Sequence, residues 1–158
     1  MNQLSTSKRT QIIAALVEGN SINATCRMLG VGKHTILRLL RDAGCACAAY
    51  HNENVRNLRV RRVQADKIWA FVYGKDKNLT MEQIQAGAGS VWTWTAIDAD
   101  SKLIISYMIG DRGAAIARAF MEDVASRICT RIQLTTDGHR MYADAVEDAF
   151  GGHSTTRC

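Results

Sequence analysis

Two aspartates lie where this sequence could bind a metal ion. Asp66 lies within the alternating segment 63–73, and Asp137 directly follows the apolar segment 132–135. Carboxylates held on neighbouring strands can share hard cations such as Mg²⁺ or Mn²⁺, which take oxygen ligands. We therefore expect Asp66 and Asp137 to be catalytic, metal-binding residues that act on nucleic acid. Each also has a structural alternative, because Asp66 could be exposed on an edge strand and Asp137 could cap the next helix.

The surrounding pattern predicts the elements that would bring these two residues together. Period-two alternation predicts strands at 63–73, 91–97 and 103–109, and four-residue spacing predicts a helix at 114–128. A fourth strand at 132–135 and a helix at 141–150 complete the series. This order is the opening of a ribonuclease-H-like fold, an antiparallel meander followed by a crossover to a strand parallel to the first. We expect an incomplete α/β domain with a mixed sheet over 63–158.

Other residues of this part are expected to be structural. The tryptophans alternate on the strand faces and are expected in the core: Trp69, Trp92 and Trp94. Asp98 and Asp100 fall in the turn between two predicted strands, where acidic residues are ordinary.

The first 44 residues have the pattern of a helix-turn-helix DNA-binding domain. Helices are predicted at 7–18, 22–29 and 33–43, with Gly30 in the turn and Gly44 ending the third helix. Ile36, Leu37, Leu39 and Leu40 are expected to face inward. The outer face of the third helix would then contact DNA through Lys33, His34, Thr35, Arg38 and Arg41. The alternative is a plain three-helix bundle with solvated charges, and the chain as a whole is expected to be α+β.

Residues 45–62 are predicted to form a basic linker. Its arginines include Arg59, Arg61 and Arg62, which are expected to contact DNA phosphates. A solvated linker helix is the alternative.

Composition agrees with a polyanionic partner and a cytoplasmic location. The 158-residue chain carries a net charge of +5, and its basic excess lies before residue 63. Its five cysteines form no regular framework and are expected to be reduced. No apolar run is long enough to span a membrane, so no membrane partner is expected.

Several segments together resemble the transposases of small bacterial insertion sequences, which carry a DDE catalytic domain. They are Asp-Lys-Ile-Trp-Ala-Phe-Val from Asp66, Val-Trp-Thr-Trp-Thr-Ala-Ile-Asp from Val91, Gly-Asp-Arg from Gly110 and Gln-Leu-Thr-Thr-Asp-Gly-His from Gln133. The resemblance implies that Asp66 and Asp137 are the first two catalytic acids, used with Mg²⁺ to cut transposon ends and join them to target DNA. It also implies double-stranded element ends as the partner, a homodimer or an assembly with full-length transposase, and a bacterial, nucleoid-associated location.

The sequence departs from that family at two points. Lys67 stands where such proteins often carry glutamate, and only 21 residues follow Asp137, too few to reach the family's third acid. We expect a truncated or frame-shifted transposase that is inactive alone; Glu147, the only glutamate after Asp137, is a poor substitute. The alternative function is a helix-turn-helix repressor or inhibitor of transposition.

Overall fold

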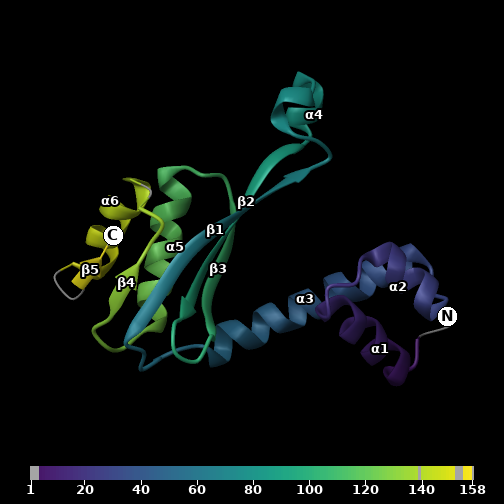
Figure 1. Cartoon of the computed structure of the whole chain (residues 1–158), viewed down its shortest axis with the longest axis horizontal. Helices are drawn as coiled ribbons and strands as arrows, with labels where there is room; N and C mark the ends of the chain where they lie inside the picture. The colour runs from purple at the N-terminus through teal and green to yellow at the C-terminus, as the bar shows by residue number, and fades with distance from the viewer. Residues whose placement is uncertain (1–3, 139, 152–154, 158) are drawn as a thin grey trace. The chain divides into compact units, whose positions relative to one another are not determined.

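The chain is a two-part α+β protein. The computed structural model describes residues 4–138, 140–151 and 155–157. It divides the chain into two compact units, Met1–Asn54 and Val55–Cys158. The first unit is all helical, and the second contains one mixed sheet with helices against it (Figure 1).

Three helices make up the first unit: α1 (Thr6–Val17), α2 (Ile22–Leu29) and α3 (Lys33–Asn54). Serine side chains begin the first two, since Ser5 and Ser21 each accept a hydrogen bond from a backbone N–H three residues later, at 3.2 Å. The helices meet around three fully buried side chains, Ile12, Thr25 and Ile36. Gly30 ends α2 in the left-handed conformation, with φ of 61°, as the sequence predicted.

The prediction that the third helix ends at Gly44 is wrong. Gly44 lies within α3, which continues for ten further residues to Asn54. Four alanines among residues 43–49 favour helix strongly enough to outweigh one glycine. Leu37 and Leu40 also differ from expectation, with 38% and 41% of their surface exposed, because only one stripe of α3 packs against the other two helices.

The sheet of the second unit has the strand order β3-β2-β1-β4-β5. β1 (Arg62–Val72), β2 (Gly89–Asp98) and β3 (Ile104–Gly110) form an antiparallel meander. β4 (Gln133–Thr135) pairs parallel with β1, and β5 (Thr155–Arg157) pairs parallel with β4. The strand β5 was not expected, because the tail shows no apolar pattern.

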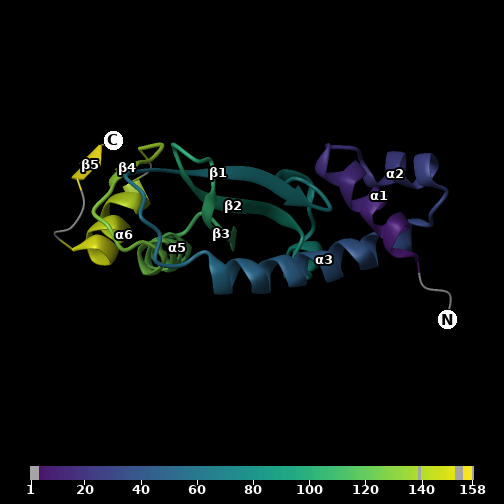
Figure 2. The ribbon, with the colours of Figure 1, turned by 90° about the horizontal axis from the view of Figure 1, so that it is seen from below.

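Two helices, α5 (Ala114–Arg127) and α6 (Arg140–Phe150), lie on the same side of this sheet (Figure 2). They enclose a core to which the sheet contributes side chains on its inner face, among them Val63, Ala65 and Trp94. The opposite face carries no helix in the described part of the unit. Between β1 and β2, the 3₁₀ helix η1 (Asp76–Asn78) and α4 (Met81–Gln85) occupy a stretch that was expected to be irregular.

Trp69 corrects the expectation for the tryptophans. Trp94 is fully buried, but Trp69 is 41% exposed because β1 continues beyond the helices that cover its first half.

The residues predicted as a basic linker, 45–62, are divided between the two units. Residues 45–54 belong to α3, and Leu58, within the second unit, pairs with the segment that follows α5. The Leu58 N–H donates to the carbonyl of Arg127 at 2.9 Å, and its carbonyl accepts from the Cys129 N–H at 3.0 Å. The backbone of the second unit is therefore hydrogen-bonded to the rest of that unit four residues before β1 begins.

Candidate functional site

The parallel pairing of β1 with β4 places Asp66 and Asp137 on one pocket. The last parallel pair is Gln64 with Thr135, and each aspartate follows its own member of that pair by two residues. The pocket holds about 320 Å³, and seven of its eight lining residues carry either a short side chain or a polar group. They are Gln64, Ala65, Asp66, Thr95, Ile97, Thr135, Thr136 and Asp137.

Asp66 is exposed on the sheet face that α5 and α6 leave uncovered. Its carboxylate accepts a hydrogen bond from the N–H of Lys67 at 2.7 Å. Thr95, opposite it on β2, donates its hydroxyl to the Asp66 carbonyl at 3.4 Å. The second carboxylate oxygen has no protein hydrogen bond among those described for Asp66, so it can face a ligand in the pocket.

Asp137 is bound by a lysine. The Lys67 ammonium forms an ion pair and hydrogen bond with the Asp137 carboxylate. Only 2% of the Lys67 side chain is exposed, against 34% for Asp137. Successive strand residues point to opposite faces, so Lys67 points inward, away from the Asp66 carboxylate next to it in sequence.

Aromatic rings surround the buried lysine. Its ammonium lies 5.6 Å from the ring centre of Trp94 and 5.2 Å from that of Tyr142. These two rings also contact each other edge to face, with centres 5.3 Å apart. The cation is thus stabilised by one carboxylate and two aromatic faces, which offset the cost of removing it from water.

Tyr142 completes the surroundings of the pair. Its hydroxyl is buried and has no hydrogen-bond partner among the described residues. Burial raises the pKa of this hydroxyl, and the negative charges of Asp137 and Asp66 raise it further. A buried hydroxyl without a partner is unusual in folded proteins, and this one belongs to the ring whose centre lies 5.2 Å from the Lys67 ammonium.

The two carboxylates are oxygen ligands of the kind that a hard cation prefers. Such a cation would compete with Lys67 for Asp137. Asp66 and Asp137 supply carboxylates to a single pocket, which suits Mg²⁺ or Mn²⁺. Among the residues that the structure describes, however, no group of three His, Cys, Asp or Glu side chains is arranged to hold a metal ion. Glu147 is exposed on α6 and does not line the pocket.

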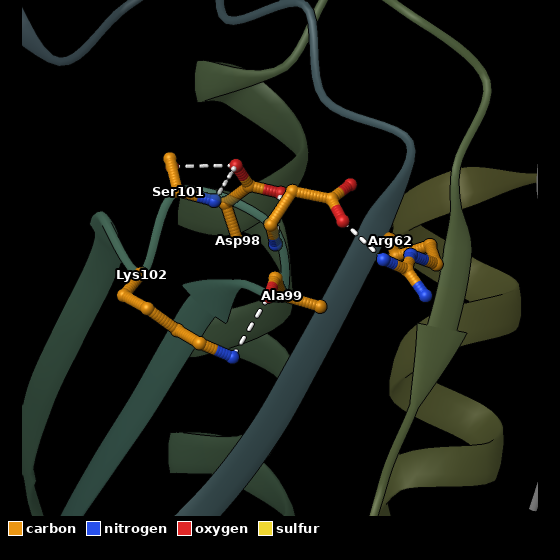
Figure 3. Close-up of polar contacts among 6 residues, drawn as sticks. Arg62, Asp98, Ala99, Ser101 and Lys102 are labelled. Carbon is orange, nitrogen blue, oxygen red and sulfur yellow. Dashed lines mark hydrogen bonds and ion pairs between the residues drawn. The ribbon is translucent and has the colours of Figure 1, made fainter.

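Asp98 and Asp100 stabilise a turn, as expected from the sequence (Figure 3). The Asp98 carboxylate accepts the N–H of Ser101 at 3.0 Å and its hydroxyl at 2.5 Å. These hydrogen bonds, led by the Ser101 hydroxyl, lower the pKa of Asp98. Asp100 forms an ion pair with Arg62, and Lys102 donates to the carbonyl of Ala99 at 2.8 Å.

The residues proposed to bind DNA are all on the surface, in two groups. One group lies on the first turns of α3 and the other near the start of β1; the exposed residues are Lys33, His34, Thr35, Arg38, Arg41, Arg59, Arg61 and Arg62. Two of them are paired with acidic side chains, Arg41 with Asp42 and Arg62 with Asp100. Hydrogen bonding to Asp100 and its charge raise the pKa of the Arg62 guanidinium.

The sequence pattern singled out the two aspartates as candidates, but it did not single out the residues that hold one of them. The alternation of β1 already placed Lys67 on the inner side, and Tyr142 lay on the predicted buried face of the last helix. Taken together, the inner face of β1 and the buried face of the last helix would have placed Lys67 and Tyr142 near Asp137, because Asp137 follows β4, the strand next to β1.

Comparison with known proteins assigns no family to the chain. No protein-family model matches the chain, and no curated protein matches it. Within the described helices, none has both the length and the apolar character that crossing a membrane requires.

Proposed function

We propose that this chain is an insertion-sequence transposase that binds element-end DNA and carries two of the three acids of a DDE site. The observation that carries this proposal is the shared pocket of Asp66 and Asp137. They are 71 positions apart in sequence and meet only because β1 and β4 are parallel neighbours. The strand order, with an antiparallel meander on one side of β1, supports a ribonuclease-H-like domain.

The first unit supports a helix-turn-helix. α2 ends in a left-handed glycine, three residues before α3 begins, and the first turns of α3 expose Lys33, His34, Thr35 and Arg38. In such domains the second helix of the pair enters the major groove, where arginine and lysine contact guanine or phosphate. We assign α3 this role, with Arg59, Arg61 and Arg62 contributing to phosphate binding.

The residues at the pocket would have different roles in cleaving a phosphodiester. Asp66 and Asp137 would hold Mg²⁺ or Mn²⁺, which supplies Lewis-acid stabilisation of the charge that develops on phosphate oxygens. Lys67 fixes the position of the Asp137 carboxylate. With two carboxylates, one of them bound to Lys67, the chain is expected not to complete cleavage and strand transfer alone.

A binding experiment tests the proposal. Purified chain is titrated onto labelled duplexes cut from the DNA that flanks its own gene, and onto duplexes of the same composition in scrambled order. Tighter binding to one flanking duplex is expected, and equal affinity for all of them would contradict it. Incubation of that duplex with Mn²⁺ should give no cutting; cutting that Asp137→Ala abolishes would show a more active enzyme than proposed.

One observation favours a second candidate, a repressor or inhibitor of transposition. The ion pair between Lys67 and Asp137 would have to change before both aspartates could bind a metal ion. DNA binding by the first unit requires no such change. A repressor should lower expression from a promoter in the flanking DNA. That effect should require Lys33 and Arg38 and be unchanged by Asp137→Ala, whereas any contribution of the chain to transposition would require Asp137.

A further inference from the structure

The strands β1 and β2 continue beyond α5 and α6 as a two-stranded ribbon with α4 near its tip (Figure 1). β4 pairs with β1 only over Arg62–Gln64, although β1 runs to Val72. In the described part of the second unit, the rest of β1 thus has β2 on one side and no strand on the other. This leaves an open strand edge within the sheet.

The open edge belongs to an apolar segment that is exposed on both faces. Residues 68–73 read Ile-Trp-Ala-Phe-Val-Tyr and contain no charge. On one face Ile68 is 62% exposed and Val72 52%, and on the other Phe71 is 46% exposed. A long apolar edge strand without charged side chains is a template for pairing with another strand.

Hydrogen bonds at the start of β1 show which backbone groups face the open edge. The Arg62 carbonyl accepts from Ala99, on the β2 side, at 2.8 Å. The Arg61 carbonyl accepts from Gln133, on the β4 side, at 2.8 Å. Since the backbone groups of a strand alternate in direction, even-numbered residues of β1 bond to β2 and odd-numbered residues face the open edge.

Two residues of the ribbon therefore present unused backbone groups. The N–H of Lys67 is already bound by the Asp66 carboxylate. Trp69 and Phe71 follow on the same edge, and among the described hydrogen bonds neither backbone N–H has a partner across it. Tyr73 has a φ of 67° and ends the extended run. The edge thus offers two consecutive sites for antiparallel pairing.

We propose that a second copy of this chain pairs with this edge, β1 to β1 and antiparallel, about a twofold axis at Ala70. In this register Trp69 lies opposite Phe71 of the second copy, and each such pair exchanges two backbone hydrogen bonds. The same register stacks these aromatic side chains across the strands on one face and sets Ile68 opposite Val72 on the other. It is the register that uses both free positions and avoids Lys67.

A second copy suits the edge because antiparallel pairing of a strand with itself is self-complementary. The segment carries no charge that the twofold axis would set against itself, and Ala70 allows close approach on the axis. Pairing of the two edges would cover part of the exposed surface of Trp69 and Phe71 on both copies. It would also bring Ile68 and Val72 of the two copies into contact on the opposite face.

The molar mass of the protein in solution tests whether two copies pair through the β1 edge. Light scattering and sedimentation of the full chain should give about twice 17.4 kDa at micromolar concentration. Ala70→Lys sets two ammonium groups against each other on the axis, so it should weaken the dimer about tenfold or more. The control is Ile109→Lys, which adds the same charge to β3 at a residue that is 64% exposed; it should leave the mass unchanged. Circular dichroism of both variants checks that they fold.

Crosslinking tests the register. In the proposed pairing the two Ala70 Cα atoms lie about 4.5 Å apart, within the range of about 4.4–6.8 Å that a disulfide spans. Ala70→Cys should form a covalent dimer under mild oxidation, with the linked peptides mapped by mass spectrometry, and Thr93→Cys on β2 should not. A monomeric wild type, a dimer that survives Ala70→Lys, or a ribbon that binds duplex DNA as a monomer would overturn the proposal.

Discussion

At the level of single residues, Lys67 determines what the pocket can bind. Two carboxylates that share a pocket repel each other unless a cation or a proton lies between them. Here an ammonium neutralises Asp137 and is held in place by Trp94 and Tyr142. A divalent cation must therefore displace this ammonium before both aspartates can bind it. If the ammonium stays, the cation binds mainly to Asp66.

Replacing the lysine should expose that competition. Lys67→Met keeps the length of the side chain among the aromatic rings and removes its charge, so the affinity for Mn²⁺ should rise about tenfold or more. An ammonium and a cation about 4 Å apart repel by roughly 4 kcal/mol near a protein surface, which makes this a modest expectation. Isothermal titration measures the affinity.

Two controls belong to this experiment. Lys77→Met removes an exposed lysine outside the pocket and should not change the affinity for Mn²⁺. Adding Asp137→Ala to Lys67→Met should reverse the gain. An affinity that Lys67→Met leaves unchanged would mean that the lysine does not compete with metal.

At the level of elements, the sequence predicted the positions of most strands and helices, because period-two and four-residue patterns were clear. The sequence-based prediction was wrong where one pattern is compatible with two structures. Gly44 can end a helix or lie within one, and the alanines that decide the matter carry no apolar pattern. Trp69 continues the inward alternation of β1, but whether a helix covers that position depends on tertiary structure.

Two glycines allow the helix boundaries to be tested as a pair. Gly44 lies within α3 with open space around its Cβ position, so Gly44→Ala should stabilise the first unit by about 1 kcal/mol. Gly30 has equally open space but a φ of 61°, so Gly30→Ala should destabilise it by about 1 kcal/mol. Hydrogen exchange of the α3 amides reports both changes. A loss of protection in Gly44→Ala would indicate that α3 ends at that glycine in solution.

A buried network ties α5 to the sheet and should give the second unit a pH-dependent stability. Asp123 accepts hydrogen bonds from Ser106 at 2.6 Å and from Arg127 at 2.7 Å. Burial alone would raise the pKa of Asp123, but the bonds from Arg127 and Ser106 outweigh it and lower the pKa. The ionised carboxylate therefore favours the folded state above its usual pKa, and this stabilisation is lost as the pH falls through the lowered value.

Asp123→Asn should thus cost about 1–3 kcal/mol of unfolding free energy at neutral pH, because Arg127 loses its charged partner. The difference from wild type should be full above about pH 5 and should shrink as the pH falls further, through the lowered pKa of Asp123, as measured by urea denaturation. Asp148→Asn is the matched control, since its ion pair with Arg118 is more than half exposed and should contribute about 0–1 kcal/mol. A pH-independent cost for Asp123→Asn would contradict the role of the charge.

At the level of the whole molecule, the two units carry different chemistry. Residues 1–54 hold six lysines and arginines against three acids, and four further arginines lie at 55–62. Most carboxylates lie in the second unit, which contains the pocket. The sequence could predict this division because charge is read directly, whereas the pairing of Lys67 with Asp137 required the fold.

DNA affinity should depend strongly on the α3 residues of the first unit. Replacing Lys33 and Arg38 together with alanine should lower the affinity for duplex DNA about tenfold or more and reduce the salt dependence, since each lost phosphate contact lowers the slope of log K against log salt by about 0.9. Fluorescence anisotropy at several salt concentrations measures both quantities. Lys75→Ala with Lys77→Ala removes the same charge from the exposed stretch between β1 and β2 and should change neither. If the two double variants weaken binding equally, net charge attracts the DNA and α3 is not its recognition helix.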